Sequence, residues 1–225
     1  MVPQARSEAT RQKILDAAID LFSEVGYAAA GLGEIIERAG MTKGALYHHF
    51  ESKDALATAI IEQGTDLTLD AFRQVCESSS PAFENMVHGV FVVTDLLVSD
   101  KAARTAEQLT RGLAEFNSAA SRVWSSQLDA ITTQARRASA EGDLREGLDP
   151  DVVGESILNA MFGAQLLCKT AGGNDHIKRL TRSLELLLPA IVADTSLTYF
   201  QEFLARESLR HPQATGSPDR AHQPY

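Results

Sequence analysis

Residues 42–50 carry several side chains that can donate hydrogen bonds. On a helix that turns about 100° per residue, Tyr47 and His48 project away from the apolar Leu46, and Lys43 lies one turn before Tyr47. An ammonium group, a phenol and an imidazole on one exposed face can bind phosphate oxygens and the edges of bases. The alternative is a short helical corner whose exposed polar side chains bind nothing.

The flanking residues predict two short helices joined by a tight turn. Gly40 can adopt the left-handed conformation that ends a helix, and Thr42 is a suitable N-cap for the next one. Gly44 would allow the backbone of the second helix to approach another surface closely. The pattern predicts a helix-turn-helix. The first helix has apolar residues at i, i+3, i+4 and i+7: Leu32, Ile35, Ile36 and Ala39.

The region from about residue 10 to residue 60 resembles the amino-terminal domain of TetR-family transcriptional regulators. The resemblance implies a partner, double-stranded operator DNA, and DNA contacts from Arg6, Thr42, Lys43, Gly44, Tyr47, His48 and Lys53. It is carried by Ile14–Phe22, Gly26–Tyr27, Ala39–Gly40, Thr42–Gly44, Leu46–Phe50 and Ser52–Leu56.

The chain departs from the family pattern at Ala30 and Gly31, where the family usually has threonine or serine. Those hydroxyls cap the following helix and contact DNA phosphate. Gly31 can still serve as a weaker N-cap, but it has no side chain to contact phosphate. We expect weaker non-specific DNA affinity, or compensation by the amino-terminal arm.

The charge balance argues mildly against a nucleic-acid partner. The chain has 225 residues, of which 44% are hydrophobic, and its net charge is −9. Residues 1–54 hold six basic and eight acidic residues, a net charge of −2. DNA binding would therefore depend on where individual basic residues lie, such as Arg6, Arg11 and Lys13 near the amino terminus.

The sequence predicts a soluble, cytoplasmic protein that does not enter a membrane. It has no secretory signal and no apolar run of about 20 residues. Its two cysteines, Cys76 and Cys168, lie in apolar helical segments and do not form a disulfide framework. We expect both to be buried, unreactive thiols.

The periodicity is helical throughout, so the predicted fold is all-α. An amino-terminal three-helix DNA-binding domain (residues 1–53) precedes a helical ligand-binding and dimerisation domain (residues 54–207) and a disordered tail (residues 208–225). Ser7 is the expected N-cap of the first helix, Ser52 of the fourth and Asp149 of a later one that starts with Pro150.

The two last strongly apolar helices, residues 151–170 and 174–192, predict an interface between two copies of the chain. A helical hairpin this apolar buries more than one side, and two hairpins would form a four-helix interface. In the family, the last two helices dimerise. The alternative is an intramolecular core. We expect Pro189 to kink or break the second helix.

The middle helices predict a mostly apolar ligand pocket with a few polar groups. The sole tryptophan, Trp124, is the preferred anchor. Its surroundings are similar to the γ-butyrolactone-receptor branch of the family, which implies a lactone-, furan- or fatty-acid-like ligand. Ordinary core packing is the alternative for each lining residue. The predicted lining residues are Phe91, Thr94, Trp124, Gln127, Leu128 and Phe162.

The sequence shows no catalytic motif and predicts no enzyme, no cofactor and no metal site. Neighbouring His48 and His49 diverge by about 100° on a helix, and His88 and His176 have no ligand at suitable spacing. The sequence therefore predicts a homodimeric repressor that a small molecule releases from a palindromic operator. The alternatives are an activator, a ligand-insensitive pseudo-receptor, or a helical protein that binds small molecules or metals but no operator.

Overall fold

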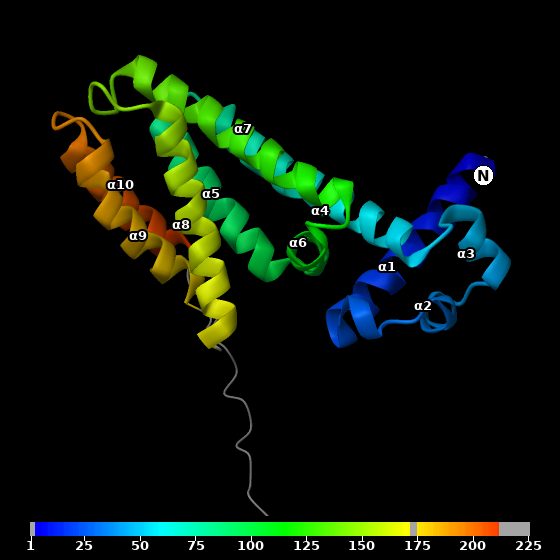
Figure 1. Cartoon of the computed structure of the whole chain (residues 1–225). Helices are drawn as coiled ribbons and strands as arrows, with labels where there is room; N and C mark the ends of the chain where they lie inside the picture. The colour runs from blue at the N-terminus through cyan, green and yellow to red at the C-terminus, as the bar shows by residue number, and fades with distance from the viewer. Residues whose placement is uncertain (1–2, 172–174, 212–225) are drawn as a thin grey trace, which may run out of the picture. The chain divides into compact units, whose positions relative to one another are not determined.

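The computed structural model describes residues 3–171 and 175–211 (Figure 1). These residues form helices and no strand, apart from one isolated bridge between Leu144 and Val192. The fold is all-α, as predicted. The helices are α1 (Pro3–Ala29), α2 (Leu32–Ala39), α3 (Lys43–His49), α4 (Lys53–Cys76), α5 (Ala82–Ser99), α6 (Lys101–Leu113), α7 (Ser118–Glu141), α8 (Pro150–Ala171), α9 (His176–Ile191) and α10 (Leu197–Arg210).

The chain divides into two compact units that alternate along the sequence. Unit 1 comprises residues 1–70 and 96–127, and unit 2 comprises residues 71–95 and 128–225. Helices α4, α5 and α7 each contribute residues to both units. The domain boundary expected after residue 53 therefore falls inside unit 1.

Unit 1 is built around one apolar core that includes the amino-terminal helices. Ile14 and Phe22 of α1, Leu46 of α3, Leu56 of α4 and Leu109 of α6 are all at most 4% exposed and belong to the same cluster. The beginning of α7 also contributes to it. The helices of the predicted DNA-binding domain thus share their core with α6 and α7, which come much later in the chain.

The ends of the first helices follow from a few residues. Helix α1 begins at Pro3, so Ser7 lies within the helix and is not its N-cap, contrary to expectation. Gly26 interrupts α1 with a φ of 81°, and Gly40 ends α2 with a φ of 62° in the left-handed region. The Ser52 hydroxyl accepts a hydrogen bond from the Ala55 N–H at 3.0 Å, as expected for the N-cap of α4.

Within unit 2, α9 packs against α8 and α10. The carboxylate of Asp149 accepts a hydrogen bond from the Asp151 N–H at 2.9 Å, and Pro150 is the first residue of α8, as predicted. Pro189 does not break α9, which continues to Ile191. Because it lies in the last turn, its missing N–H affects only one bond near the helix end.

Helix α10 extends to Arg210, so residues 208–210 are helical and do not belong to the expected tail. Residues 212–225 of that tail lie outside the described residues. Helix α5 is long and apolar enough to cross a membrane, by length and composition only. However, 61% of this stretch is buried within the protein, which is typical of a core helix.

Candidate nucleic-acid interface

Helix α3 has one buried and one exposed face, as the sequence predicts. Leu46 is 0% exposed and Phe50, its C-cap, is 4% exposed, so both anchor the helix in the core of unit 1. The Thr42 hydroxyl oxygen accepts a hydrogen bond from the Ala45 N–H at 3.1 Å and caps the helix. Because Thr42 is exposed, its hydroxyl hydrogen remains available to a phosphate oxygen.

The opposite face of α3 presents Lys43, Gly44, Tyr47 and His48 to solvent. Tyr47 is 45% exposed, although its ring is large and could have packed inside. The Lys43 ammonium lies 5.8 Å from the centroid of the Tyr47 ring, within the range of a cation–π interaction. The four residues therefore form a continuous exposed surface with three different donors, hereafter the α3 face.

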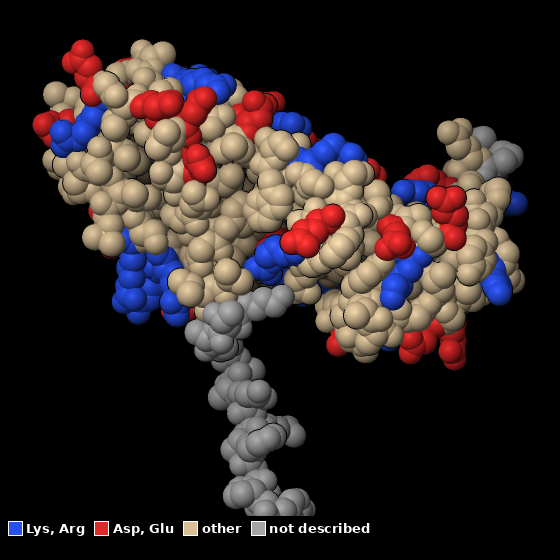
Figure 2. Space-filling model, viewed as in Figure 1, with Lys and Arg blue, Asp and Glu red and all other residues tan. Residues whose placement is uncertain are grey.

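The basic side chains of unit 1 differ in whether they form ion pairs with acidic residues. Arg38 forms two hydrogen bonds of 2.7 Å to Glu24, and Lys101 lies 2.6 Å from Asp20. Among the described residues, Arg6, Lys13 and Lys43 have no ion pair. On the side drawn in Figure 2, acidic and basic side chains are mixed over α2 and α3.

The ammonium group of Lys53 is already hydrogen-bonded within the protein. Its ammonium donates hydrogen bonds to the carbonyl oxygens of Tyr27 at 2.9 Å and Ala30 at 3.0 Å, and lies 3.4 Å from that of Ala28. It also lies 4.5 Å from the centroid of the Tyr27 ring. An ammonium group has three donors, and all three have acceptors here. This arrangement argues against the phosphate contact expected of Lys53 and assigns it to the junction between α1 and α4.

Tyr27 belongs to the same junction. Its hydroxyl is hydrogen-bonded to the Asp54 carboxylate, and its ring packs edge-on against Phe22 with centroids 5.4 Å apart. Burial, together with the negative charge of Asp54, raises the pKa of Tyr27 to about 12. Tyr27, Lys53 and Asp54 together fix the end of α1 to the start of α4.

The start of α2 is capped from one side only. Gly31 is the N-cap, as predicted, and its N–H donates to the Glu34 carboxylate at 3.0 Å. Glu34 therefore supplies half of a capping box from the helix side. Ala30 is only 2% exposed. Of the two departures from the family pattern, position 31 alone could present a side chain outwards.

The six predicted ligand-binding residues divide between the two units. Trp124 and Gln127 lie one turn apart on α7 within unit 1, and both are half-buried. In unit 2, Phe91 and Thr94 are 0% exposed, Phe162 is half-buried and Leu128 is 36% exposed. The Thr94 hydroxyl donates to the Val90 carbonyl at 2.7 Å, as an ordinary core threonine does.

Two grooves in unit 2, each with a volume of about 450 Å³, are lined by other residues. One runs along α9 and includes Lys178 and Arg182, and the other includes Glu84, His88 and Arg206. None of the six predicted ligand-binding residues lines either groove.

Several buried polar atoms make no hydrogen bond within the described residues. They include the Thr105 hydroxyl and the Gln127 carbonyl oxygen in unit 1, and the Gln165 amide nitrogen in unit 2. Buried polar atoms are normally paired, so such groups often mark the place of a ligand or water. The sequence pattern predicts Gln127 as a ligand-binding residue, whereas nothing in the sequence distinguishes Thr105 or Gln165 from other polar residues.

Both cysteines are buried and free, as expected. Burial raises the pKa of the Cys76 thiol to about 11. Burial and a hydrogen bond to Asp175 likewise raise the pKa of Cys168 to about 11. Because the thiolate is the reactive form, neither residue is suited to redox sensing.

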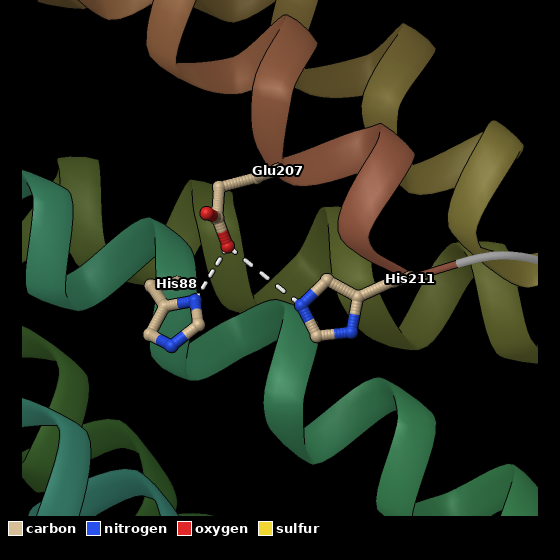
Figure 3. Close-up of side chains that lie close together, drawn as sticks. All are labelled: His88, Glu207 and His211. Carbon is tan, nitrogen blue, oxygen red and sulfur yellow. Dashed lines mark hydrogen bonds and ion pairs between the residues drawn. The ribbon is translucent and has the colours of Figure 1, made fainter.

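His88, which has no ligand at suitable spacing in the sequence, has two potential metal ligands beside it in the fold. Glu207 and His211, more than a hundred positions away in sequence, lie beside it in unit 2 (Figure 3). Glu207 and His211 are four residues apart at the end of α10, a spacing that the sequence does contain. His88 joins them only when α5 and α10 pack together.

An all-helical chain with a capped helix-turn-helix and an exposed, donor-rich second helix defines a DNA-binding protein of the helix-turn-helix class. The family model described as "Bacterial regulatory proteins, tetR family" matches residues 14–60. The A-factor receptor protein of Streptomyces griseus is 30% identical over 192 residues, which cover 85% of this chain and 67% of that protein. The chain belongs to the TetR family of bacterial transcriptional regulators. It is a DNA-binding transcription regulator and not an enzyme.

Two solved structures share the fold over almost their whole length. A gamma-butyrolactone receptor described as an ArpA-like protein has a TM-score of 0.74 and 25% identity, covering 91% of this chain and 99% of its own. CprB from Streptomyces coelicolor, in complex with its biological operator sequence, has a TM-score of 0.72 and 25% identity, with the same coverage of 91% and 99%. Members of the family are soluble and bind operator DNA and small molecules.

Proposed function

We propose that this regulator is a homodimeric repressor that occupies a palindromic operator in the cytoplasm and leaves it when a small molecule binds. The exposed α3 face carries the DNA-binding part of the proposal. Its four residues lie on the second helix of a helix-turn-helix, where base edges are read in this class of protein. The opposite side of α3 is held rigidly by Leu46 and Phe50.

The residues of the interface have separate roles in this proposal. Lys43, Tyr47 and His48 contact base edges in the major groove, and Gly44 allows the helix backbone to approach the DNA. Thr42, at the amino-terminal end of α3, contacts a phosphate. Arg6, exposed near the start of α1, contacts the DNA backbone. Lys53 is left out because its three donors are already used.

Truncation of Tyr47 tests the α3 face. Tyr47→Ala should weaken operator binding about 10-fold or more, because a good base contact is worth about 1–3 kcal/mol. Its melting temperature should fall by no more than a few degrees, since the ring is 45% exposed. Tyr199 of α10 is also 45% exposed, so Tyr199→Ala is a matched control that should leave operator binding unchanged. Normal binding by Tyr47→Ala would contradict the proposed face.

The genes that flank this one would narrow the search for the operator. A gel shift with the DNA upstream of this gene and of its neighbours would identify the target. A reporter fused to that promoter should be more active when the regulator is deleted. Lower activity after deletion would make the protein an activator.

The proposed ligand is small and mostly apolar, of lactone, furan or fatty-acid type. The similarity to proteins named A-factor receptor and gamma-butyrolactone receptor supports this class. Trp124 remains the proposed anchor, and the unpaired carbonyl oxygen of Gln127, one turn further along α7, would accept a hydrogen bond from the ligand or from a bridging water.

The single tryptophan gives a direct measurement of ligand binding. Titration of the protein with a candidate lactone should change Trp124 emission over the same concentration range in which the operator is released. By thermodynamic linkage, operator DNA must weaken ligand binding by the same factor as the ligand weakens operator binding. A ligand that releases the operator from Trp124→Ala and leaves wild-type emission unchanged would place the pocket elsewhere.

A further inference from the structure

Two histidines and a glutamate from distant parts of the chain meet in unit 2 (Figure 3). His88 is on α5, Glu207 is on α10, and His211 is the C-cap of α10. One nitrogen from each imidazole and one carboxylate oxygen all lie within 4.8 Å of one another. The three side chains therefore present three potential metal ligands to a common point.

Both imidazole rings face the same oxygen atom of Glu207. Its Oε2 atom lies 2.5 Å from Nδ1 of His88 and 3.7 Å from Nε2 of His211. The Glu207 side chain is 0% exposed. A carboxylate removed from water in this way requires positive or hydrogen-bonding partners around it. The cluster thus consists of one buried carboxylate and two imidazole rings that face it.

The outer partners orient these atoms towards one another. Arg210 pairs with the other carboxylate oxygen of Glu207, with Nη1 2.6 Å from Oε1. The Asp95 carboxylate accepts a hydrogen bond from Nδ1–H of His211, which leaves the lone pair of that ring on Nε2. This Nε2 atom is buried and makes no hydrogen bond within the described residues. In metal sites, a carboxylate commonly accepts a hydrogen bond from the histidine nitrogen that does not bind the metal, and so orients the ring.

We propose that His88, Glu207 and His211 bind a divalent transition-metal ion, for which Zn²⁺ is the best match. Two imidazole nitrogens and one carboxylate oxygen form a ligand set that zinc accepts, with water in the fourth position. Bonds of about 2.0–2.1 Å would place the ligand atoms about 3.3 Å apart in a tetrahedral site. Nε2 of His211, now 3.7 Å from Glu207 Oε2, would move in by about 0.4 Å, and Nδ1 of His88, now 2.5 Å from that oxygen, would move away by about 0.8 Å. The metal would replace the proton shared by His88 and Glu207.

The ion has a route of entry. The groove of about 450 Å³ that is lined by His88, Glu207 and Arg210 reaches the cluster, and the His88 side chain is 35% exposed. Once bound, the metal would join α5 to the carboxy-terminal end of α10. Because the unfolded chain does not hold these ligands together, binding should stabilise the folded protein. The site requires neither operator nor small-molecule inducer.

The test uses the full-length chain without an affinity tag, freed of metal by a chelator and then titrated with Zn²⁺ alone. Calorimetry should show one Zn²⁺ bound per chain, and thermal unfolding should shift upwards by several degrees at saturating metal. Co²⁺ in the same position should give the visible absorption bands of a four-coordinate ion. Wild-type protein that binds no stoichiometric Zn²⁺ and shows no thermal shift would overturn the proposal, whatever the variants do.

Substitutions locate the binding. Glu207→Gln keeps the shape of the side chain but removes its charge, and His88→Gln removes one ligand. Each should weaken Zn²⁺ binding at least 10-fold and abolish the cobalt bands. Asp95→Asn, a positioning change, should weaken binding about 10- to 100-fold. His176→Gln, a half-buried histidine of unit 2 outside the cluster, should bind like the wild type. Unchanged Zn²⁺ binding by folded Glu207→Gln and His88→Gln would place the metal elsewhere and overturn the assignment.

Discussion

At the scale of single residues, Lys53 shows that a basic side chain beside a DNA-binding helix can already be occupied by the protein's own backbone. Its ammonium satisfies carbonyl groups of residues 27, 28 and 30, where the chain leaves α1. These carbonyls would otherwise need water or another donor. The same side chain therefore serves stability in a place where the family resemblance suggests a phosphate contact.

Lys53→Gln should consequently lower the free energy of unfolding by about 1–2 kcal/mol, because it removes hydrogen bonds from a charged donor. The dependence of operator affinity on salt should keep its slope. Arg6→Gln is the counterpart: it should leave stability unchanged and reduce the slope by about 0.9 for each phosphate that the protein no longer neutralises. Denaturant unfolding and operator titrations at several salt concentrations separate the two. A reduced slope in Lys53→Gln would restore its phosphate role.

Tyr27 gives the same junction a dependence on alkaline pH. Its pKa is raised from 10.0 to about 12, so the folded state holds the phenolic proton more tightly than the unfolded state does. The resulting stabilisation is complete below pH 10 and is lost as the pH rises from 10 towards 12. Tyr27→Phe should therefore lose less stability over this interval than the wild type. Asp54→Asn should lower the pKa of Tyr27, as measured by phenolate absorbance, and an unchanged value would leave burial as its sole cause.

At the scale of helices, α4 and α6 of unit 1 approach closely at Gly64. A methyl group added to Gly64 would lie 2.2 Å from the Cβ atom of Ala106, far inside contact distance. Because protein interiors are densely packed, Gly64→Ala should lower the free energy of unfolding by about 1–3 kcal/mol. Gly112→Ala is a suitable control: this exposed glycine of α6 has no atom near its added methyl group, and the change should stabilise by up to about 1 kcal/mol.

The contact between Gly64 and Ala106 can also be tested with a compensating substitution. Ala106→Gly should relieve the clash, so the double variant with Gly64→Ala should be more stable than Gly64→Ala alone. Circular dichroism during thermal unfolding of the four proteins is sufficient. If the double variant is the least stable of the set, direct contact between these two positions is not the cause of the destabilisation.

The helices themselves were predictable where local chemistry sets their limits. Thr42, Ser52 and Asp149 are side chains that accept backbone N–H groups, and each marks a helix start at the predicted place. The expected effect of Pro189 did not occur because it depends on position: in the last turn the missing N–H costs little, and α9 continues to Ile191. Periodicity identifies a helix, but packing decides its last residues.

The candidate sites also differ in how far the sequence predicts them. The α3 face follows from one short segment, so periodicity alone separates its buried Leu46 from its exposed Tyr47. Lys53 and the His88 cluster depend on groups about 25 and more than 100 residues away. Such contacts leave no spacing pattern in the sequence, because they arise only from the packing of whole helices.

At the scale of the whole molecule, the second exposed face of the α8–α9 hairpin supports the proposed dimer. The inner stripe of α9, including Leu180, Leu184 and Leu188, is buried within one chain, so the intramolecular alternative explains that stripe. Outside it, Val152 of α8 is 56% exposed and Leu186 of α9 is 82% exposed. In the proposed dimer, a second copy of the chain would cover these two side chains.

Leu186→Glu should weaken dimerisation about 10-fold or more, because in a two-fold interface each introduced charge is buried without a partner. Leu209→Glu on α10 is the matched control, since Leu209 is 81% exposed and lies outside the proposed interface. Analytical ultracentrifugation measures both. Operator footprints should cover an inverted repeat with half-sites about 34 Å apart or a multiple of it. A wild-type monomer at micromolar concentration, or a single asymmetric half-site, would contradict the dimer.

The shared core of unit 1 limits where this protein can be divided into parts that fold independently. Ile14, Leu46 and Leu56 rest on the same apolar cluster as Leu109 and Val123, which the chain supplies only after leaving unit 1 and returning to it. A fragment that ends at residue 53 would expose part of that cluster and should not fold by itself. A chimeric regulator made by joining the first 53 residues to another receptor would therefore inherit an incomplete interior. A working exchange would have to carry α6 and the beginning of α7 together with the helix-turn-helix.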